Sequence, residues 1–171
     1  MASPRPKAAF PEPKHDHGIC VADILARGQE AFDSKGLRLT PLRRLVFEEI
    51  AASHTAIGAY DVLDRLARKS QSRLAPISVY RAIDALLEAG VVHRLESRNA
   101  FFACHARHLP DSRTIVLACD ACDSVLECPG EPIFAAIDDV AENSRFLPAQ
   151  VMVEVRGRCG HCAEQKSTAS P

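Results

Sequence analysis

The spacing of apolar residues divides this chain of 171 residues into two halves with different periodicities. Between about residues 21 and 90, apolar residues recur every three or four positions, which is the spacing of one buried helical face. In the second helix of this region, the predicted buried stripe is Leu42, Leu45, Val46 and Ile50. The pattern predicts four helices, which begin near Val21, Pro41, Ala59 and Pro76.

Capping residues indicate where these helices begin and end. Thr40 followed by Pro41 is a strong start signal, because a threonine hydroxyl caps the first turn and proline is favoured at the first helical position. Gly36 and Gly90 are expected to end the first and fourth helices. The exposed face of the fourth helix is predicted to carry Ser78, Tyr80, Arg81 and Asp84.

A hairpin is predicted directly after the fourth helix. The runs 91–96 and 100–104 are rich in strand-forming residues, and a polar Ser97-Arg98-Asn99 turn joins them. Short helices followed by a two-stranded hairpin form the winged-helix plan, in which a late helix enters the major groove of DNA. A helical bundle whose hairpin contacts another protein is the alternative reading of the same pattern.

The second half of the chain alternates strands with one helix. Strands are predicted over 114–118, 124–127 and 150–155, and a helix over about 132–144 with Ile133, Phe134, Ile137 and Val140 as its apolar stripe. A sheet this small has an exposed edge beside an apolar helix, which favours pairing with a second copy of the chain. The predicted fold class is therefore α+β, with a winged-helix domain followed by a small α/β dimerisation domain.

Two C-x-x-C pairs in the second half supply the clearest chemistry. Cys119, Cys122, Cys159 and Cys162 have the pattern of four thiolates that close a tetrahedron around a structural zinc ion. Such a site has no open coordination position, so it serves stability and not catalysis. The alternatives are two disulfides or unrelated buried thiols.

Composition and charge narrow the class of protein. With 47% hydrophobic and 25% charged residues, the chain has the composition of an ordinary soluble globular protein. Residues 1–98 carry 15 basic and 12 acidic side chains, whereas residues 99–171 carry 6 and 10, so the first half is mildly basic. Residues 1–18 are rich in proline and lack the apolar segment of a secretion signal, and no apolar run is long enough to span a membrane. We therefore expect a cytoplasmic protein, whose clustered cysteines bind metal.

These motifs together resemble the ferric uptake regulator (Fur) family of dimeric, metal-sensing bacterial repressors. The resemblance rests on residues 37–43, on Ser78-Val79-Tyr80-Arg81-Ala82 with Leu86, Leu87 and Gly90, and on the two cysteine pairs. It implies a winged-helix DNA-binding domain (21–98, with wing and hinge to about 105) and a dimerisation and metal-binding domain (106–165). The residues outside these domains are expected to form a disordered, proline-rich arm (1–20) and a disordered tail (166–171). The resemblance also implies a regulatory metal site at the hinge.

Within this family, the chain resembles the zinc uptake regulator (Zur) branch. Where iron- and peroxide-sensing members usually have a regulatory histidine, this chain has Ala56. His93, Cys104 and Glu127 stand where the resemblance places three zinc ligands, and thiolate with imidazole suits zinc better than iron. The expected fourth histidine falls on Ser112, so His108 is the candidate fourth ligand, with His105 as the alternative.

The resemblance implies a zinc-responsive repressor that is not an enzyme. It would carry one structural and one regulatory zinc ion per subunit, and would bind double-stranded operator DNA as a homodimer, with no membrane partner and no small organic substrate. Its targets would be zinc uptake genes. The DNA-contacting residues would be Tyr60, Ser78, Tyr80 and Arg81, with Arg81 reading a base, and Arg43 and Arg44 on phosphates.

Other functions stay open on the sequence alone. Within the family, the alternative is a sensor of iron, manganese or peroxide. From other classes, the alternatives are a thiol-disulfide oxidoreductase, since C-x-x-C motifs can be redox centres, and a zinc-buffering or structural zinc module. No role is assigned to His15, His17, Cys20 or Cys128.

Overall fold

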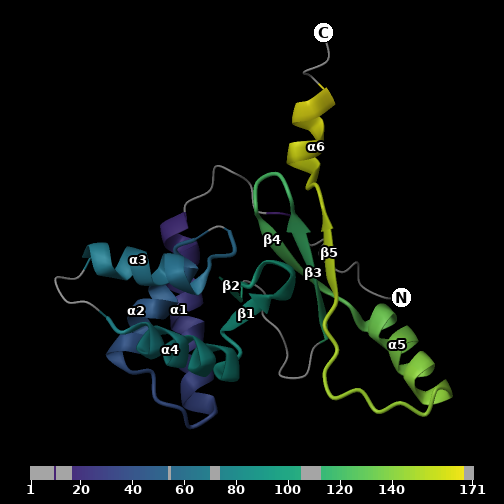
Figure 1. The fold of residues 1–171 in the computed structure, drawn as a ribbon, viewed down its shortest axis with the longest axis horizontal. Helices are drawn as coiled ribbons and strands as arrows, with labels where there is room; N and C mark the ends of the chain where they lie inside the picture. Colours follow the sequence, from purple (N-terminus) through teal and green to yellow (C-terminus); the bar gives the residue numbers. More distant parts are fainter. Residues whose placement is uncertain (1–9, 11–16, 54, 70–73, 105–112, 168–171) are drawn as a thin grey trace. The chain divides into compact units, whose positions relative to one another are not determined.

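The computed structural model describes residues 10, 17–53, 55–69, 74–104 and 113–167 of the chain (Figure 1). Residues 12–105 form one compact unit, called here the N-terminal unit. Residues 106–171 belong to a second, the C-terminal unit. Among the helices of the described ranges, none has the length and apolarity that a membrane span requires.

The N-terminal unit consists of helices followed by a two-stranded hairpin, as the sequence predicts. Its core is built around α2, which packs against α1, α3 and α4. The largest fully buried side chains here include Phe32, Phe47, Ile50, Ile83 and Leu86. The elements are α1 (His17–Ser34), α2 (Pro41–Ala51), α3 (Ala59–Lys69), α4 (Pro76–Ala89), β1 (Val92–Leu95), a short 3-10 helix (Glu96–Arg98) and β2 (Ala100–Ala103).

The helix ends follow from local chemistry. The Thr40 hydroxyl accepts a hydrogen bond from the Arg43 backbone N–H at 3.4 Å, and Pro41 is the first residue of α2. Gly90 ends α4 with φ 75°, a left-handed conformation that glycine adopts without a steric penalty. The chain therefore leaves α4 abruptly and enters β1 two residues later.

The hairpin is antiparallel and tied to the helices. Val92 pairs with Ala103 and Leu95 pairs with Ala100. Ile57, in the connection between α2 and α3, exchanges two backbone hydrogen bonds of 2.8 Å with Phe101. Buried residues of both strands complete the helical core, so the hairpin is a fixed part of the N-terminal unit.

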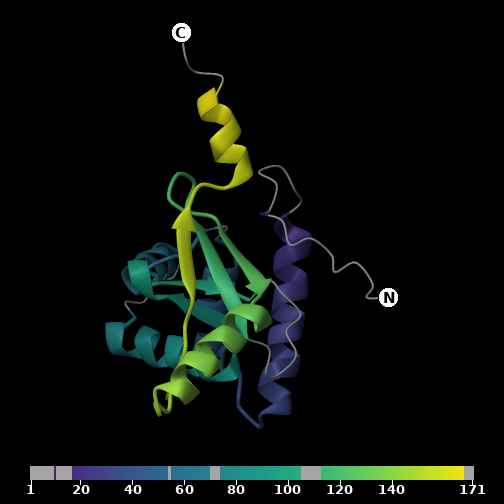
Figure 2. The same cartoon turned by 90° about the vertical axis from the view of Figure 1, so that its right-hand side faces the viewer.

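The C-terminal unit is a three-stranded sheet with two helices, which Figures 1 and 2 show from two directions. The strand order is β4-β3-β5, with β3 antiparallel to β4 and parallel to β5. Helix α6 continues from the end of β5 and points away from the sheet in both views. The elements are β3 (Thr114–Cys119), β4 (Val125–Pro129), α5 (Glu131–Asn143), β5 (Glu154–Gly157) and α6 (Gly160–Ser167).

Several element boundaries differ from the predicted ones. Helix α1 begins at His17, inside the range predicted to be disordered, because no helix-breaking proline lies between residues 17 and 21. Strand β5 begins at Glu154 and not at residue 150, and the Val116 N–H donates to the Val153 carbonyl at 2.9 Å just before it. Helix α6 was not predicted, since it lacks an apolar stripe.

Two of the predicted buried stripes are only partly buried. Leu45 is 47% exposed, because Val46, Phe47 and Ile50 define the buried face of α2 and Leu45 lies beside it. On α5, Phe134 and Ala141 are buried, whereas Ile133 and Val140 are exposed. Phe146, Leu147, Met152 and Val155 of the C-terminal unit are also exposed. Many apolar side chains of the C-terminal unit are therefore exposed in a single copy of the chain.

Candidate metal centre and nucleic-acid interface

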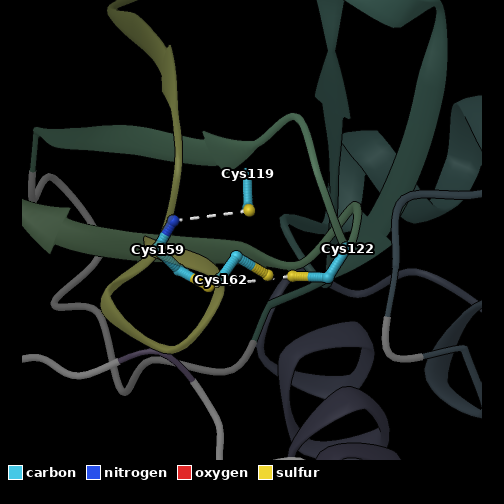
Figure 3. Close-up of side chains that lie close together, drawn as sticks. All are labelled: Cys119, Cys122, Cys159 and Cys162. Carbon is cyan, nitrogen blue, oxygen red and sulfur yellow. Dashed lines mark hydrogen bonds between the residues drawn. The ribbon is translucent and has the colours of Figure 1, made fainter. Parts of the chain in front are cut away.

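The four predicted zinc ligands converge in the C-terminal unit (Figure 3). Cys119 is the last residue of β3 and Cys122 lies in the turn to β4, while Cys159 follows β5 and Cys162 lies in α6. Cys162 therefore lies in a helix, whereas Cys122 lies in a turn. All four sulfur atoms lie within 4.8 Å of one another, and Cys119 and Cys159 are buried.

The spacing and surroundings of these sulfurs fit a zinc ion. Zinc–sulfur bonds of about 2.3 Å in a tetrahedron place sulfurs about 3.8 Å apart, and the Cys122 and Cys159 sulfurs are 3.8 Å apart. The backbone N–H groups of Ala121 and Cys159 both donate to the Cys119 sulfur at 3.4 Å. None of the seven cysteines, all of which lie in the described ranges, forms a disulfide. The donor set therefore fits zinc and not a pair of disulfides.

Hydrogen bonds within the site shift the pKa values of two of these thiols in opposite directions. Burial raises the pKa of the Cys119 thiol, but backbone hydrogen bonds from Cys159, Ala121 and Cys122 outweigh burial and lower this pKa to about 6. Hydrogen bonds with the sulfurs of Cys159 and Cys122 raise the pKa of Cys162 to about 12. A bound zinc ion would supply the positive charge that four thiolates require.

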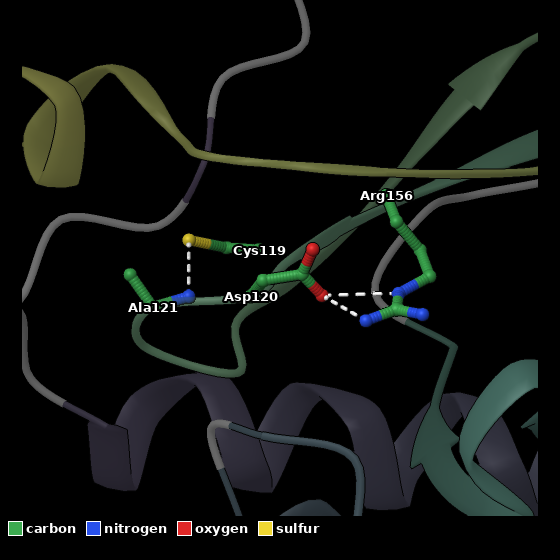
Figure 4. Close-up of polar contacts among 4 residues, drawn as sticks. All are labelled: Cys119, Asp120, Ala121 and Arg156. Atoms are coloured by element: carbon green, nitrogen blue, oxygen red, sulfur yellow. Dashed lines mark hydrogen bonds and ion pairs between the residues drawn. The ribbon is translucent and has the colours of Figure 1, made fainter.

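An ion pair supports the first cysteine pair from β5 (Figure 4). The guanidinium of Arg156 donates to one carboxylate oxygen of Asp120 through Nε at 3.0 Å and Nη2 at 2.9 Å. The Asp120 backbone N–H donates to the Gly157 carbonyl at 2.7 Å. These contacts join the Cys119–Cys122 turn to the strand that leads into the second cysteine pair. No local sequence pattern indicates this pairing, because the partners lie 36 positions apart.

Replacing Arg156 with glutamine is expected to speed zinc loss from the four-cysteine site by up to about fivefold, since half-exposed ion pairs contribute up to about 1 kcal/mol. The measurement is the rate of zinc transfer to a chromogenic chelator. Arg158→Gln, at another exposed arginine two positions further along, is the matched control and should lose zinc at the wild-type rate. Equal rates for both variants would show that Asp120 needs no support from Arg156.

A second pair of zinc-type donors lies on the hairpin of the N-terminal unit. His93 pairs with Phe102 in the ladder, so His93 and Cys104 are diagonal neighbours on the same face. The nearest ligand atoms of His93 and Cys104 lie within 4.8 Å of each other. The His93 ring lies 5.6 Å from the Phe102 ring, and the Cys104 N–H donates to the Val91 carbonyl at 3.0 Å. The hairpin therefore presents a nitrogen and a sulfur donor together, and His93 lies four residues after the end of α4 at Ala89.

The other predicted regulatory ligands lie elsewhere in the chain. Glu127 is a buried residue of β4 in the C-terminal unit, where it pairs with Val116. His108 and His105, the candidates for the fourth ligand, lie outside the described residues, as does Ser112. Cys128, beside Glu127 on β4, has a pKa raised by burial and by the Glu127 charge, and it does not belong to the four-cysteine group.

The exposed face of α4 carries two of the six predicted DNA-contacting residues. Tyr80 and Arg81 are exposed, whereas Ser78 is half-buried at the side of the helix. Tyr60, at the start of α3, is 69% exposed, and its ring meets the Tyr80 ring edge-on at a centroid distance of 6.2 Å. The structure therefore places Tyr60 beside α4, although the two residues lie 20 positions apart.

The two predicted phosphate contacts have acceptors within the chain. Arg43 donates to the Arg38 carbonyl at 2.6 Å, and Arg44 donates to the Gln29 side chain at 2.8 Å. Each guanidinium has five N–H groups, so both retain donors for a phosphate. These bonds hold the two side chains at the start of α2, which lowers the entropy cost of a further contact.

Comparisons with known proteins agree on one family. The model of the ferric uptake regulator family matches residues 34–156. The zinc uptake regulation protein of Escherichia coli (strain K12) is 33% identical over 149 residues, which are 87% of this chain and 86% of that protein. A zinc uptake regulator complexed with zinc and DNA is 33% identical with a TM-score of 0.79, covering 86% of this chain and 97% of that one. Holo XcZur is 35% identical with a TM-score of 0.74, and the match covers 84% of this chain and 99% of that one.

Proposed function

This chain belongs to the ferric uptake regulator family, and on that premise we propose that it is a zinc-responsive transcriptional repressor that binds operator DNA as a homodimer. The observation that carries the proposal is the His93–Cys104 pair on the hairpin that directly follows α4. A donor pair suited to zinc is thereby joined, through the short turn at Gly90, to the helix whose exposed face carries Arg81. The genes it controls would be those for zinc uptake, and it would act in the cytoplasm, where its operators lie.

We assign two zinc ions to each subunit. The four cysteines of the C-terminal unit would hold the structural ion. His93, Cys104 and Glu127 would hold the regulatory ion, with His108 as fourth donor and His105 as the alternative. The imidazole and thiolate come from the N-terminal unit and the carboxylate from the C-terminal unit. A bound ion supplies a cross-link, so these three residues would fix the two units to each other and favour one arrangement of the two α4 helices in a dimer.

The dimer would form through the C-terminal unit. Exposed apolar side chains on α5, on the connection after it and on β5 are accounted for if a second copy covers them. Among the described strands, β5 lies at the edge of the sheet, with β3 as its neighbour on one side. We assign no catalytic role to any residue.

Arg81→Ala is expected to lower the ratio of operator affinity to scrambled-DNA affinity. The lost part of this ratio is the contribution of one base pair in each half-site. A bidentate arginine–guanine contact is worth about 1–3 kcal/mol of discrimination, which is about 5- to 150-fold in the affinity ratio. Arg44→Ala is the comparison, since loss of a phosphate contact lowers the affinity for the operator and for the scrambled duplex by the same factor. If Arg81→Ala keeps the wild-type affinity ratio, Arg81 does not read a base.

The proposal as a whole is tested by fluorescence anisotropy on an uptake-gene promoter fragment, with free zinc buffered across a titration and Fe(II) and Mn(II) in parallel. Specific binding that rises with zinc alone, while the tightly held zinc stays bound, is the expected result. A response to iron or manganese would keep the family and refute zinc sensing. Absence of specific binding with every metal would favour a structural zinc module.

A further inference from the structure

The first turn of α4 carries an apolar side chain that the core does not use. Ile77 is the second residue of the helix, after Pro76, and its side chain is 59% exposed. The buried face of α4 is made by Val79, Ala82, Ile83, Ala85, Leu86 and Ala89. At 100° per residue, Ile77 and Arg81 lie one turn apart on the side directly opposite that face. Ile77 is therefore the immediate neighbour of Arg81 on the outward surface.

The rest of the outward surface limits which part of α4 can approach DNA. Asp84 and Glu88 continue the same face toward the C-terminal end, and both are exposed. Their charges repel phosphates, whereas Arg81 attracts them. Close approach to a duplex is therefore confined to the first turn and a half, where Ile77 and Arg81 lie. Recognition helices of this class contact base edges with their N-terminal residues.

We infer that Ile77 reads sequence by contacting the C5 methyl group of a thymine next to the base that Arg81 contacts. This inference rests on the proposed function, in which α4 binds operator DNA. The thymine methyl is the apolar group that a base edge presents in the major groove, so it is the feature that an exposed isoleucine recognises. The Tyr60–Tyr80 edge-to-face pair borders the same end of α4, and its rings would exclude water from the contact.

The test replaces each operator thymine in turn with deoxyuridine, which removes only the methyl group, and measures affinity by anisotropy in zinc-replete buffer. For the wild-type protein, one substitution per half-site is expected to weaken binding about fourfold, which is the equivalent of about 0.8 kcal/mol for one buried methyl-sized group. Ile77→Ala should bind the thymine operator more weakly by a similar factor and should lose its response to deoxyuridine at that position. Leu45→Ala, which removes an exposed leucine from α2, is the matched control and should keep the wild-type response.

The possible outcomes distinguish failure of the thymine contact from failure of the proposed function. An Ile77→Ala protein that responds to deoxyuridine at the same positions and by the same factor as wild type overturns the thymine contact, even if its overall affinity falls. Ile77→Val, which keeps a shorter apolar side chain, should show a partial response, and it provides the same comparison if the alanine variant folds poorly. Failure of the wild-type protein to bind any operator specifically would overturn the proposed function and, with it, the role of Ile77.

Discussion

Cys119→Ser is expected to abolish tight zinc binding and to unfold the C-terminal unit, with loss of the dimer. Structural zinc contributes about 10–16 kcal/mol in small zinc domains, which matches or exceeds the 5–15 kcal/mol by which whole domains are typically stable. The Cys119 sulfur accepts two backbone hydrogen bonds from the two halves of the site, so its removal affects both cysteine pairs. The measurements are zinc content after gel filtration, sedimentation velocity and the thermal unfolding profile.

Cys128→Ser is the control for that experiment. Cys128 lies in the same unit and is half-buried on β4, but it does not belong to the four-cysteine group. It should keep its zinc and remain dimeric. In Cys119→Ser, the helices of the N-terminal unit should still form, because their core is built from residues 24–103. The structural role of the cluster would be refuted if Cys119→Ser retained one tightly bound zinc ion per subunit and the wild-type midpoint of thermal unfolding.

Cys104→Ser is expected to remove the zinc dependence of DNA binding while leaving the structural zinc in place. Allosteric coupling energies of about 1–3 kcal/mol correspond to about 5- to 150-fold in affinity, and the variant should lose that factor in zinc-replete buffer. His93→Ala should give the same loss, because the two donors share one face of the hairpin. Combining the two changes should cost little more than either alone, since each already removes the site.

Cys20→Ser serves as the control here. Cys20 is a half-buried cysteine of α1 in the same N-terminal unit, and no metal role is assigned to it. It should bind DNA with the wild-type zinc response. Anisotropy with buffered zinc compares the wild-type protein and the four variants on one operator. If Cys104→Ser still switches at the wild-type zinc concentration, the regulatory ligands lie elsewhere.

Local signals in the sequence accounted for much of the fold. Thr40 with Pro41, Pro76 and Gly90 set helix ends through capping and φ preferences, which neighbouring residues determine. The two C-x-x-C pairs could be grouped because their spacing is a property of metal coordination. The family resemblance, and not periodicity, identified His93, Cys104 and Glu127 as candidate ligands of the regulatory zinc ion.

The remaining features depend on contacts that periodicity does not encode. The sequence does not show whether the apolar stripe on α5 packs into the core of the same chain or contacts a second copy, because both arrangements require the same spacing of apolar residues. The Asp120–Arg156 pair depends on the parallel pairing of β3 and β5, which no local pattern specifies. The exposure of Ile77 could have been found, since it lies four residues before Arg81 on the helix.

If zinc at the His93–Cys104 site controls DNA binding, operator DNA must in turn control zinc binding at that site. The zinc affinity of the more weakly held ion is determined without DNA, with operator duplex and with scrambled duplex. Linkage requires operator DNA to tighten zinc binding by the same factor by which zinc tightens operator binding, about 5- to 150-fold. We expect this equality for the wild-type protein, and we expect operator DNA to have no effect on the zinc affinity of Cys104→Ser. An unchanged zinc affinity in the presence of bound operator would contradict zinc control of DNA binding at this site.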